Sequence, residues 1–159
     1  MPGPANPKAL LNALNLKPVD RINGLRGNDE LSGSEMRDII RGLGGHDTLS
    51  GLFGADTLFG GQGNDALFGG GDDDKLYGEN GADTLHGDDG GDLLFGGRGS
   101  DTLFGGEGQD FLYGDTENPN FGAGNETSDD YLDGGAGNDY ILGGRGSDML
   151  FGGDGDDAL

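Results

Sequence analysis

Aliphatic residues recur along most of this chain every nine residues, and each one follows an aspartate by two positions. We number each nine-residue unit so that the aspartate falls at position six and the aliphatic residue at position eight. The fourteen aspartates are Asp29, Asp38, Asp47, Asp56, Asp65, Asp74, Asp83, Asp92, Asp101, Asp110, Asp130, Asp139, Asp148 and Asp157. The aliphatic residues are Leu31, Ile40, Leu49, Leu58, Leu67, Leu76, Leu85, Leu94, Leu103, Leu112, Leu132, Ile141, Leu150 and Leu159. A period this strict indicates a repeat architecture.

Glycine fills much of positions one, two and four, which argues against a helix because each glycine costs about 1 kcal/mol relative to alanine there. We expect a short strand at positions seven to nine, with position eight pointing inward, and a turn at positions one to six. One inward residue buries little surface until another unit stacks on it. If two units make one coil, the strands of units n and n+2 lie side by side in two parallel sheets, about 4.8 Å apart.

The composition favours cations as partners. The chain has 159 residues, of which 38 are glycine and 31% are hydrophobic, so little material is left for a conventional globular core. Its formal charge of -21 comes from 30 acids against 9 bases. Nucleic acid and anionic membranes are repelled by such a charge. The absence of cysteine excludes disulfides and thiolate metal sites.

Residues 1–23 lack the period and leave two interpretations open. The run from Lys8 to Leu16 can form about two helical turns, and Pro18 ends it. This segment is either a leader or linker, or a short apolar cap over the first coil of the stack. The run is too short to span a membrane and lacks a small-x-small cleavage site, so we expect neither membrane insertion nor an N-terminal signal peptide.

The turns carry the candidate chemistry. Glycine at positions one, two and four allows backbone carbonyls to converge, and the aspartate at position six adds a carboxylate. An all-oxygen donor set in a flexible geometry favours Ca²⁺ over Mg²⁺. We expect each ion to lie between the turns of units n and n+2, which allows at most about twelve sites in fourteen units. Twelve dications nearly neutralise the formal charge of -21.

Three units show the pattern in full: Gly60 to Phe68 (GGQGNDALF), Gly96 to Phe104 (GGRGSDTLF) and Gly134 to Leu142 (GGAGNDYIL). They resemble the haemolysin-type, or RTX, calcium-binding nonapeptide. The resemblance covers residues 24–159 and implies an all-β, right-handed parallel β-roll. It also implies an extracellular bacterial protein of the type I secretion class, whose export signal follows the repeats. Because the chain ends at position eight of a unit, we expect a module of a longer protein that contacts a neighbouring domain.

Several units depart from the pattern. Met36 at position four makes the second unit the weakest candidate, whereas Asp72 at the same position tolerates left-handed backbone angles. Units one to four, seven and eight lack the second glycine, so looser ion binding is expected there. Eleven extra residues precede Asp130, and we interpret residues 115–128 as an inserted loop. A surface insertion is favoured there over an extra ion site or a partner contact made by Asp115, Glu117, Glu126 and Asp129.

The chain shows no catalytic motif. It contains no His-Glu-x-x-His, no Gly-x-Ser-x-Gly and no phosphate-binding loop, so we expect no enzyme within these residues. Two alternatives to a calcium module stay open: the end of a secreted protease, lipase or haemolysin, and an adhesin or surface-layer face. His46 and His86 are expected at the surface. The aromatic residues at position nine are expected to align as Phe59, Tyr77, Phe95 and Tyr113 on one sheet and Phe68, His86 and Phe104 on the other, as plain stacking or as a binding face.

Overall fold

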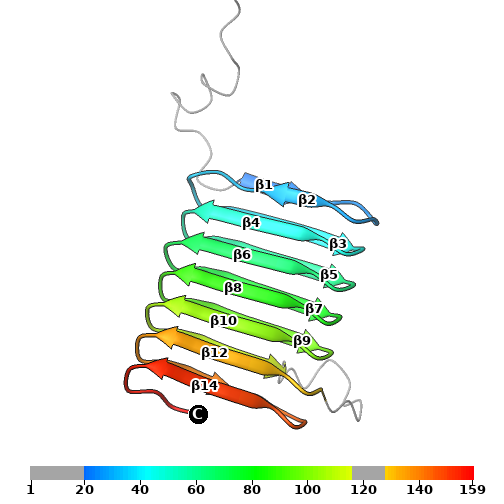
Figure 1. Cartoon of the computed structure of the whole chain (residues 1–159). Helices are drawn as coiled ribbons and strands as arrows, with labels where there is room; N and C mark the ends of the chain where they lie inside the picture. Colours follow the sequence, from blue (N-terminus) through cyan, green and yellow to red (C-terminus); the bar gives the residue numbers. More distant parts are fainter. Residues whose placement is uncertain (1–19, 116–127) are drawn as a thin grey trace, which may run out of the picture.

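The computed structural model of the chain describes residues 20–115 and 128–159 as a stack of coils that are each built from two strands (Figure 1). The predicted helical run at residues 8–16 lies outside the described residues. In the described parts no helix is long and apolar enough to cross a membrane. The strands are β1 (Asp20–Asn23), β2 (Glu30–Ser32), β3 (Asp38–Gly44), β4 (Thr48–Phe53), β5 (Thr57–Gln62), β6 (Ala66–Gly71), β7 (Lys75–Asn80), β8 (Thr84–Asp89), β9 (Leu93–Arg98), β10 (Thr102–Glu107), β11 (Phe111–Asp115), β12 (Tyr131–Ala136), β13 (Tyr140–Leu142) and β14 (Met149–Asp154).

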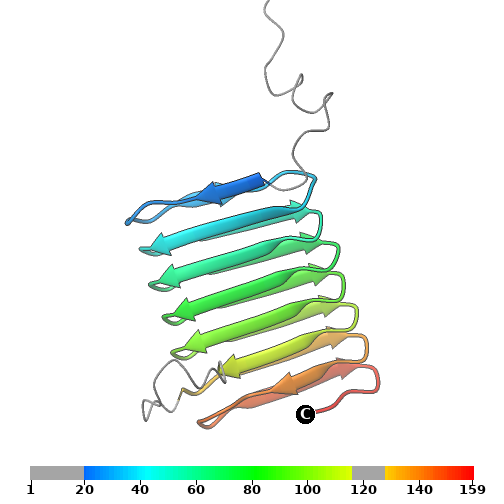
Figure 2. The same cartoon turned by 180° about the vertical axis from the view of Figure 1, so that it is seen from behind.

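The strands form two seven-stranded parallel sheets. The odd-numbered strands follow one another in sheet A, and the even-numbered strands do so in sheet B (Figures 1 and 2). Leu58 of β5 pairs with Leu76 of β7, and Leu76 pairs with Leu94 of β9. Each partner therefore lies eighteen residues, or two units, further along the chain. This register confirms the predicted all-β solenoid with two nine-residue units per coil.

Most strands are longer than the sequence predicts. β5 runs through positions seven to nine of one unit and on through positions one to three of the next, where Gly61 pairs with Glu79 and Gln62 with Asn80. The turn is therefore confined to positions four to six in such units, and the expected six-residue turn is wrong. The glycine-rich half stays in the ladder because it meets an equivalent backbone eighteen residues away, which satisfies its N–H and C=O groups.

The roll also begins earlier than the period indicates. β1 pairs with β3 in a register that aligns Asp20 with Asp38 and Ile22 with Ile40. Ile22 packs against the hydrophobic core. This first strand lies inside the segment that we assigned to the leader, because no glycine turn precedes Asp20 and no complete unit marks its place.

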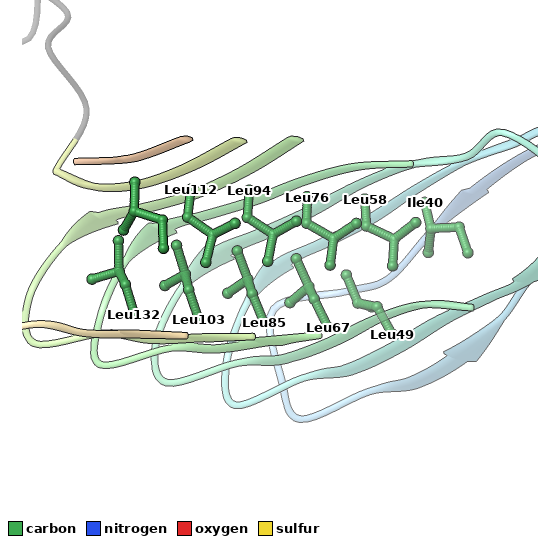
Figure 3. Close-up of a cluster of buried hydrophobic side chains, with 11 residues drawn as sticks. Ile40, Leu49, Leu58, Leu67, Leu76, Leu85, Leu94, Leu103, Leu112 and Leu132 are labelled. Atoms are coloured by element: carbon green, nitrogen blue, oxygen red, sulfur yellow. The ribbon is translucent and has the colours of Figure 1, made fainter. Parts of the chain in front are cut away.

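The core is a thin double row of aliphatic side chains between the two sheets (Figure 3). Ile40, Leu58 and Leu76 follow one another along sheet A and face the row of sheet B, which includes Leu49 and Leu67. Eleven of the fourteen predicted position-eight residues are completely buried. Leu31 and Leu150 near the ends are only partly buried, and Leu159 is exposed. Burial of one such side chain stabilises the fold by about 1.5–3 kcal/mol.

The position-nine side chains stack on the outer faces as the sequence predicts. Phe59 and Tyr77 lie 4.9 Å apart between ring centroids with an interplanar angle of 9°, and the stack continues to Phe95 and Tyr113. On sheet B the imidazole of His86 lies between two phenylalanines, Phe68 and Phe104. The stacks follow directly from the parallel register, which places equivalent side chains on neighbouring strands.

The roll resumes in register after the inserted segment. Leu103 of β10 pairs with Leu132 of β12, which is twenty-nine residues further along and not eighteen. The difference matches the eleven extra residues. Residues 116–127 lie outside the described part of the chain, and with them Glu117 and Glu126.

Candidate metal sites

The predicted aspartates form two columns, one along each sheet, and each aspartate stands just before a strand or at its first residue, except Asp157, which precedes the isolated bridge at Ala158. The column of sheet A comprises Asp38, Asp56, Asp74, Asp92, Asp110, Asp139 and Asp157, and the column of sheet B comprises Asp29, Asp47, Asp65, Asp83, Asp101, Asp130 and Asp148. Eleven of the fourteen are at most 3% exposed. Asp29, Asp148 and Asp157, near the ends of the stack, are half-buried. The fold thus places most of the acidic column away from water.

Each column is held together by hydrogen bonds between successive coils. The backbone N–H of Asp65 donates to Oδ1 of Asp83 at 2.8 Å, and the N–H of Asp83 donates to Oδ1 of Asp101 at 2.8 Å. Both columns follow this scheme from end to end, with distances of 2.6–3.0 Å. One oxygen of each accepting carboxylate is therefore satisfied by the chain itself.

The other carboxylate oxygen has no partner. Among the described residues, a buried Oδ2 atom makes no hydrogen bond in Asp47, Asp56, Asp65, Asp74, Asp83, Asp92, Asp101, Asp110, Asp130 and Asp139. In Asp38 the buried atom without a hydrogen bond is Oδ1. A buried polar atom without a partner normally costs about 1–3 kcal/mol, and more when it is charged. Because the Oδ2 atom at position six lacks a partner in ten units, these oxygens indicate binding sites for a positively charged ligand.

Beside the glycine at position one, a backbone carbonyl oxygen of the next coil lies near the unpartnered carboxylate oxygen. A methyl group built on Gly78 would lie 2.5 Å from Oδ2 of Asp83 and 2.5 Å from the carbonyl oxygen of Gly96 in the next coil. A side chain at position one would therefore fill the space that the two acceptor oxygens share. We expected this glycine to adopt unusual backbone angles, but positive φ occurs at positions two and four, as in Gly61 (116°) and Gly63 (118°). Position one therefore requires glycine because a Cβ atom would collide with these two oxygen atoms.

The first two units differ from the rest. The N–H of Leu25 donates to Oδ2 of Asp29 at 2.6 Å, and the N–H of Ser34 donates to Oδ2 of Asp38 at 2.7 Å. Leu25 and Ser34 occupy position two, and neither has the positive φ that this position adopts in the units from Gly42 to Asp110, where even Leu43 shows 81°. In these two turns the chain's own donors occupy the carboxylate oxygen that is free elsewhere.

Burial raises the pKa of nine of the column aspartates. The pKa of Asp101 rises to about 8 because of burial, while the N–H of Asp83 lowers it in part and the charges of Asp83, Asp130 and Asp115 raise it further. For the same main reason the pKa is about 7 for Asp74, Asp83 and Asp92, about 6 for Asp56, Asp110 and Asp130, and raised for Asp65 and Asp139. Without a cation the folded roll resists ionisation of these carboxyls.

Position five supplies a second ladder that the sequence analysis missed. Oδ1 of Asn28 accepts from the N–H of His46 at 2.9 Å, and Nδ1 of His46 accepts from the N–H of Asn64 at 2.8 Å. Oδ1 of Asn64 accepts from the N–H of Ala82 at 3.1 Å. Short polar side chains recur at position five, and this recurrence was the available signal. Their role is to satisfy turn N–H groups, so His46 serves the turn and lies at the exposed surface.

The carboxylates beside the inserted segment also satisfy backbone and hydroxyl donors. Oδ1 of Asp115 accepts from the hydroxyl of Ser128 at 2.7 Å, and its Oδ2 accepts from the N–H of Arg145 at 2.6 Å. Oδ1 of Asp129 accepts from the N–H of Ser147 at 2.8 Å. These bonds close the base of the insertion, which favours a tolerated surface insertion over an ion site there.

The donor set suits a hard cation that accepts backbone ligands. Within residues 20–115 and 128–159 no three histidine, aspartate or glutamate side chains gather as a metal cage. A cation at the columns must therefore combine one or two carboxylate oxygens with carbonyl oxygens, which is the chemistry of calcium sites.

The comparison with known families decides which repeat this is. The model of the RTX calcium-binding nonapeptide repeat matches residues 19–49, 32–67, 50–85, 59–94, 86–118 and 125–159. The chain belongs to the RTX calcium-binding nonapeptide repeat family. RTX repeats bind calcium in a β-roll, which is a structural fold and not a catalytic one, and the family is typical of secreted bacterial proteins. No curated protein matches the chain at a significant level.

Proposed function

We propose that this chain is a secreted module that folds when calcium binds between the turns of units n and n+2. The observation that carries the proposal is the row of buried aspartates with one unpartnered oxygen each. Calcium at these oxygens removes the cost of burying like charges, so the free energy of ion binding becomes free energy of folding. Up to about twelve ions can be bound in this way.

The column aspartates are the proposed ligands, and they are not equivalent. The turns from that of Asp47 to that of Asp139 combine an unpartnered Oδ2 with a carbonyl of the next coil, as Asp83 and Gly96 do. Asp29 and Asp38 are weaker ligands because Leu25 and Ser34 donate to their Oδ2 atoms. Asp148 and Asp157, the last aspartates of the two columns, are weaker as well, because no carbonyl of a further described coil lies beside them.

Calcium-dependent folding suits a protein that leaves the cell unfolded. Extracellular calcium modules typically bind with dissociation constants of about 10⁻⁴ to 10⁻³ M, which is far above the concentration of free calcium in cytosol. The chain thus stays unfolded during type I export and folds outside. It supports secretion and extracellular stability, and no chemical step is assigned to it.

Ion counting by native mass spectrometry tests the ligand assignment. The wild-type protein at millimolar calcium should carry several ions, and Asp83→Ser should carry at least one fewer. Asp89→Ser changes an exposed carboxylate outside the columns and serves as the matched control. An unchanged ion count in Asp83→Ser, or an equal loss in Asp89→Ser, contradicts the assignment.

A further inference from the structure

The chain contains two Asn–Gly dipeptides, Asn23–Gly24 and Asn80–Gly81. In an unfolded chain this dipeptide deamidates readily, because glycine places no side chain beside the reacting atoms and leaves the backbone able to turn. Asn80 is the last residue of β7, near the middle of the stack, and its side chain is exposed (Figure 1). Access of water does not limit the reaction at Asn80, so the backbone must decide whether it occurs.

The folded roll holds the reacting backbone nitrogen in place. Deamidation begins when the nitrogen of the following residue attacks the side-chain carbonyl carbon of asparagine. The N–H of Gly81 donates to the carbonyl oxygen of Arg98 at 2.8 Å, and the carbonyl oxygen of Asn80 accepts from the N–H of Gly63 at 2.9 Å. Both bonds belong to the peptide group that joins Asn80 to Gly81. This group cannot rotate toward the side chain of Asn80 until both hydrogen bonds break.

The fold requires the glycine of this pair but not the asparagine. Gly81 has a φ of 142°, and a Cβ atom there would collide with the carbonyl group of Gly63 in the preceding coil. Position three is not restricted in this way, because Gln62 and Arg98 pair with Asn80 from the two neighbouring coils. Asn80 can therefore be replaced without disturbing the turn, which provides a clean control.

We propose that Asn80–Gly81 is a deamidation site that reacts in the calcium-free chain and is protected in the folded roll. The protection by calcium rests on the proposed function. The nitrogen of Gly81 forms a bond to Cγ of Asn80, its proton passes through water to Nδ2, and ammonia leaves. Water then opens either carbonyl of the resulting succinimide, which gives aspartate or isoaspartate at residue 80.

Isoaspartate at residue 80 disturbs the coil that contains it. The main chain then passes through Cβ, which adds one backbone atom between residues 80 and 81. Asp83 follows three residues after Asn80, and its column requires alignment with Asp65 and Asp101 in the two neighbouring coils. The added atom shifts this alignment. A chain that remains calcium-free for long therefore loses part of its ability to fold when calcium is supplied.

Asn23–Gly24 provides a comparison at the end of the stack. The N–H of Gly24 donates to the carbonyl oxygen of Arg41 at 2.7 Å, so its nitrogen is also held. However, β1 is the outermost of the described strands of sheet A and pairs with β3 alone. Terminal elements open more easily than central ones. In calcium, Asn23 should therefore deamidate faster than Asn80, whereas in EDTA the two rates should be similar.

Peptide mapping of the full chain tests the site. Trypsin cleaves after Lys75 and Arg98, and Asn80 is the only asparagine between them. At pH 7 its conversion should be at least about tenfold slower in millimolar calcium than in EDTA, because the reaction requires local opening. Gln62–Gly63, the equivalent pair one coil earlier, should react slowly under both conditions, since the longer side chain must close a six-membered ring.

Refolding after ageing gives a second readout. After long incubation in EDTA, calcium should restore the far-UV circular dichroism of Asn80→Gln more fully than that of a wild type converted at residue 80. Equal recovery overturns the proposal. So does conversion of Asn80 at the EDTA rate in protein that circular dichroism shows to be folded. If calcium does not fold the chain, the proposed function fails instead. An excluded osmolyte then provides the folded protein, in which Asn80 should still be protected.

Discussion

Replacing Asp101 by asparagine should stabilise the calcium-free roll and destabilise the calcium-bound one. Asp101 is 2% exposed, and its Oδ1 accepts from the N–H of Asp83 at 2.8 Å. Its Oδ2 shares the space at Gly96 with the carbonyl oxygen of Gly114. Asparagine keeps the Oδ1 acceptor and places an NH₂ donor where two acceptors now face each other, so it removes a charge and adds a hydrogen bond.

The magnitude follows from the pKa of Asp101, which burial raises from 3.8 to about 8. Each pKa unit corresponds to about 1.4 kcal/mol, so at pH 7 this carboxyl destabilises the calcium-free fold by about 4 kcal/mol. Asparagine removes this cost. With calcium bound, the substitution lowers the free energy of unfolding. A site with a dissociation constant of about 10⁻⁴ M stabilises the fold by about 2.7 kcal/mol at a hundredfold excess of ion, and loss of a ligand removes much of this stabilisation.

Folding curves followed by far-UV circular dichroism provide the assay. With EDTA at pH 7, folding is driven by an excluded osmolyte, and Asp101→Asn should need less of it than the wild type. With calcium, unfolding is driven by urea, and the variant should unfold at a lower concentration. Asp89→Asn, at an exposed position, should shift neither midpoint. A variant that is less stable under both conditions refutes the reasoning, because the carboxylate would then stabilise the roll without an ion.

Three further perturbations test the core, the turn and the titration. Leu85→Ala in the centre of the completely buried row should lower the calcium-bound unfolding free energy by about 2–5 kcal/mol in urea titrations, and Leu31→Ala at the partly buried end by less. Gly78→Ala should reduce calcium affinity in titration calorimetry, because the methyl group would meet two oxygen atoms at 2.5 Å, whereas Gly27→Ala meets nothing within 4 Å and should bind normally. In EDTA the folded population should be larger near pH 4 than near pH 8 by circular dichroism: burial raises the pKa of Asp83 and its equivalents, so the stability present below pH 4 is lost as the pH rises through about 7. A calcium-free protein that gains structure with rising pH contradicts this sign.

The period predicts short strands that stack, and the resemblance to RTX repeats implies the β-roll. The coil of two units was a condition of the prediction, and the pairing of Leu58 with Leu76, two units apart, confirms it. The aromatic stacks follow from the same register, as Phe59 and Tyr77 show. The column of aspartates follows as well, since every unit carries its carboxylate two residues before the core position.

What the sequence could not supply depends on contacts between coils. The glycine-rich residues after Phe59 belong to β5 because they pair with β7, and their composition alone suggests a turn. β1 was assigned to the leader because Asp20 and Ile22 lack the glycines that mark a unit. The reason for glycine at Gly78 is the approach of two oxygen atoms, one of them from the next coil. Hydrogen bonds from one turn to the next decide which carboxylate oxygen remains free.

The most direct test of the account is a calcium titration of chelated protein, followed by far-UV circular dichroism with ions counted in parallel by native mass spectrometry. We expect little β-structure in EDTA at pH 7, a cooperative gain in the millimolar range of calcium, and several ions bound to each folded molecule. Magnesium at the same concentration is expected to produce neither. A spectrum that does not change between EDTA and saturating calcium, whether folded or unfolded throughout, would contradict the claim that calcium binding folds the roll.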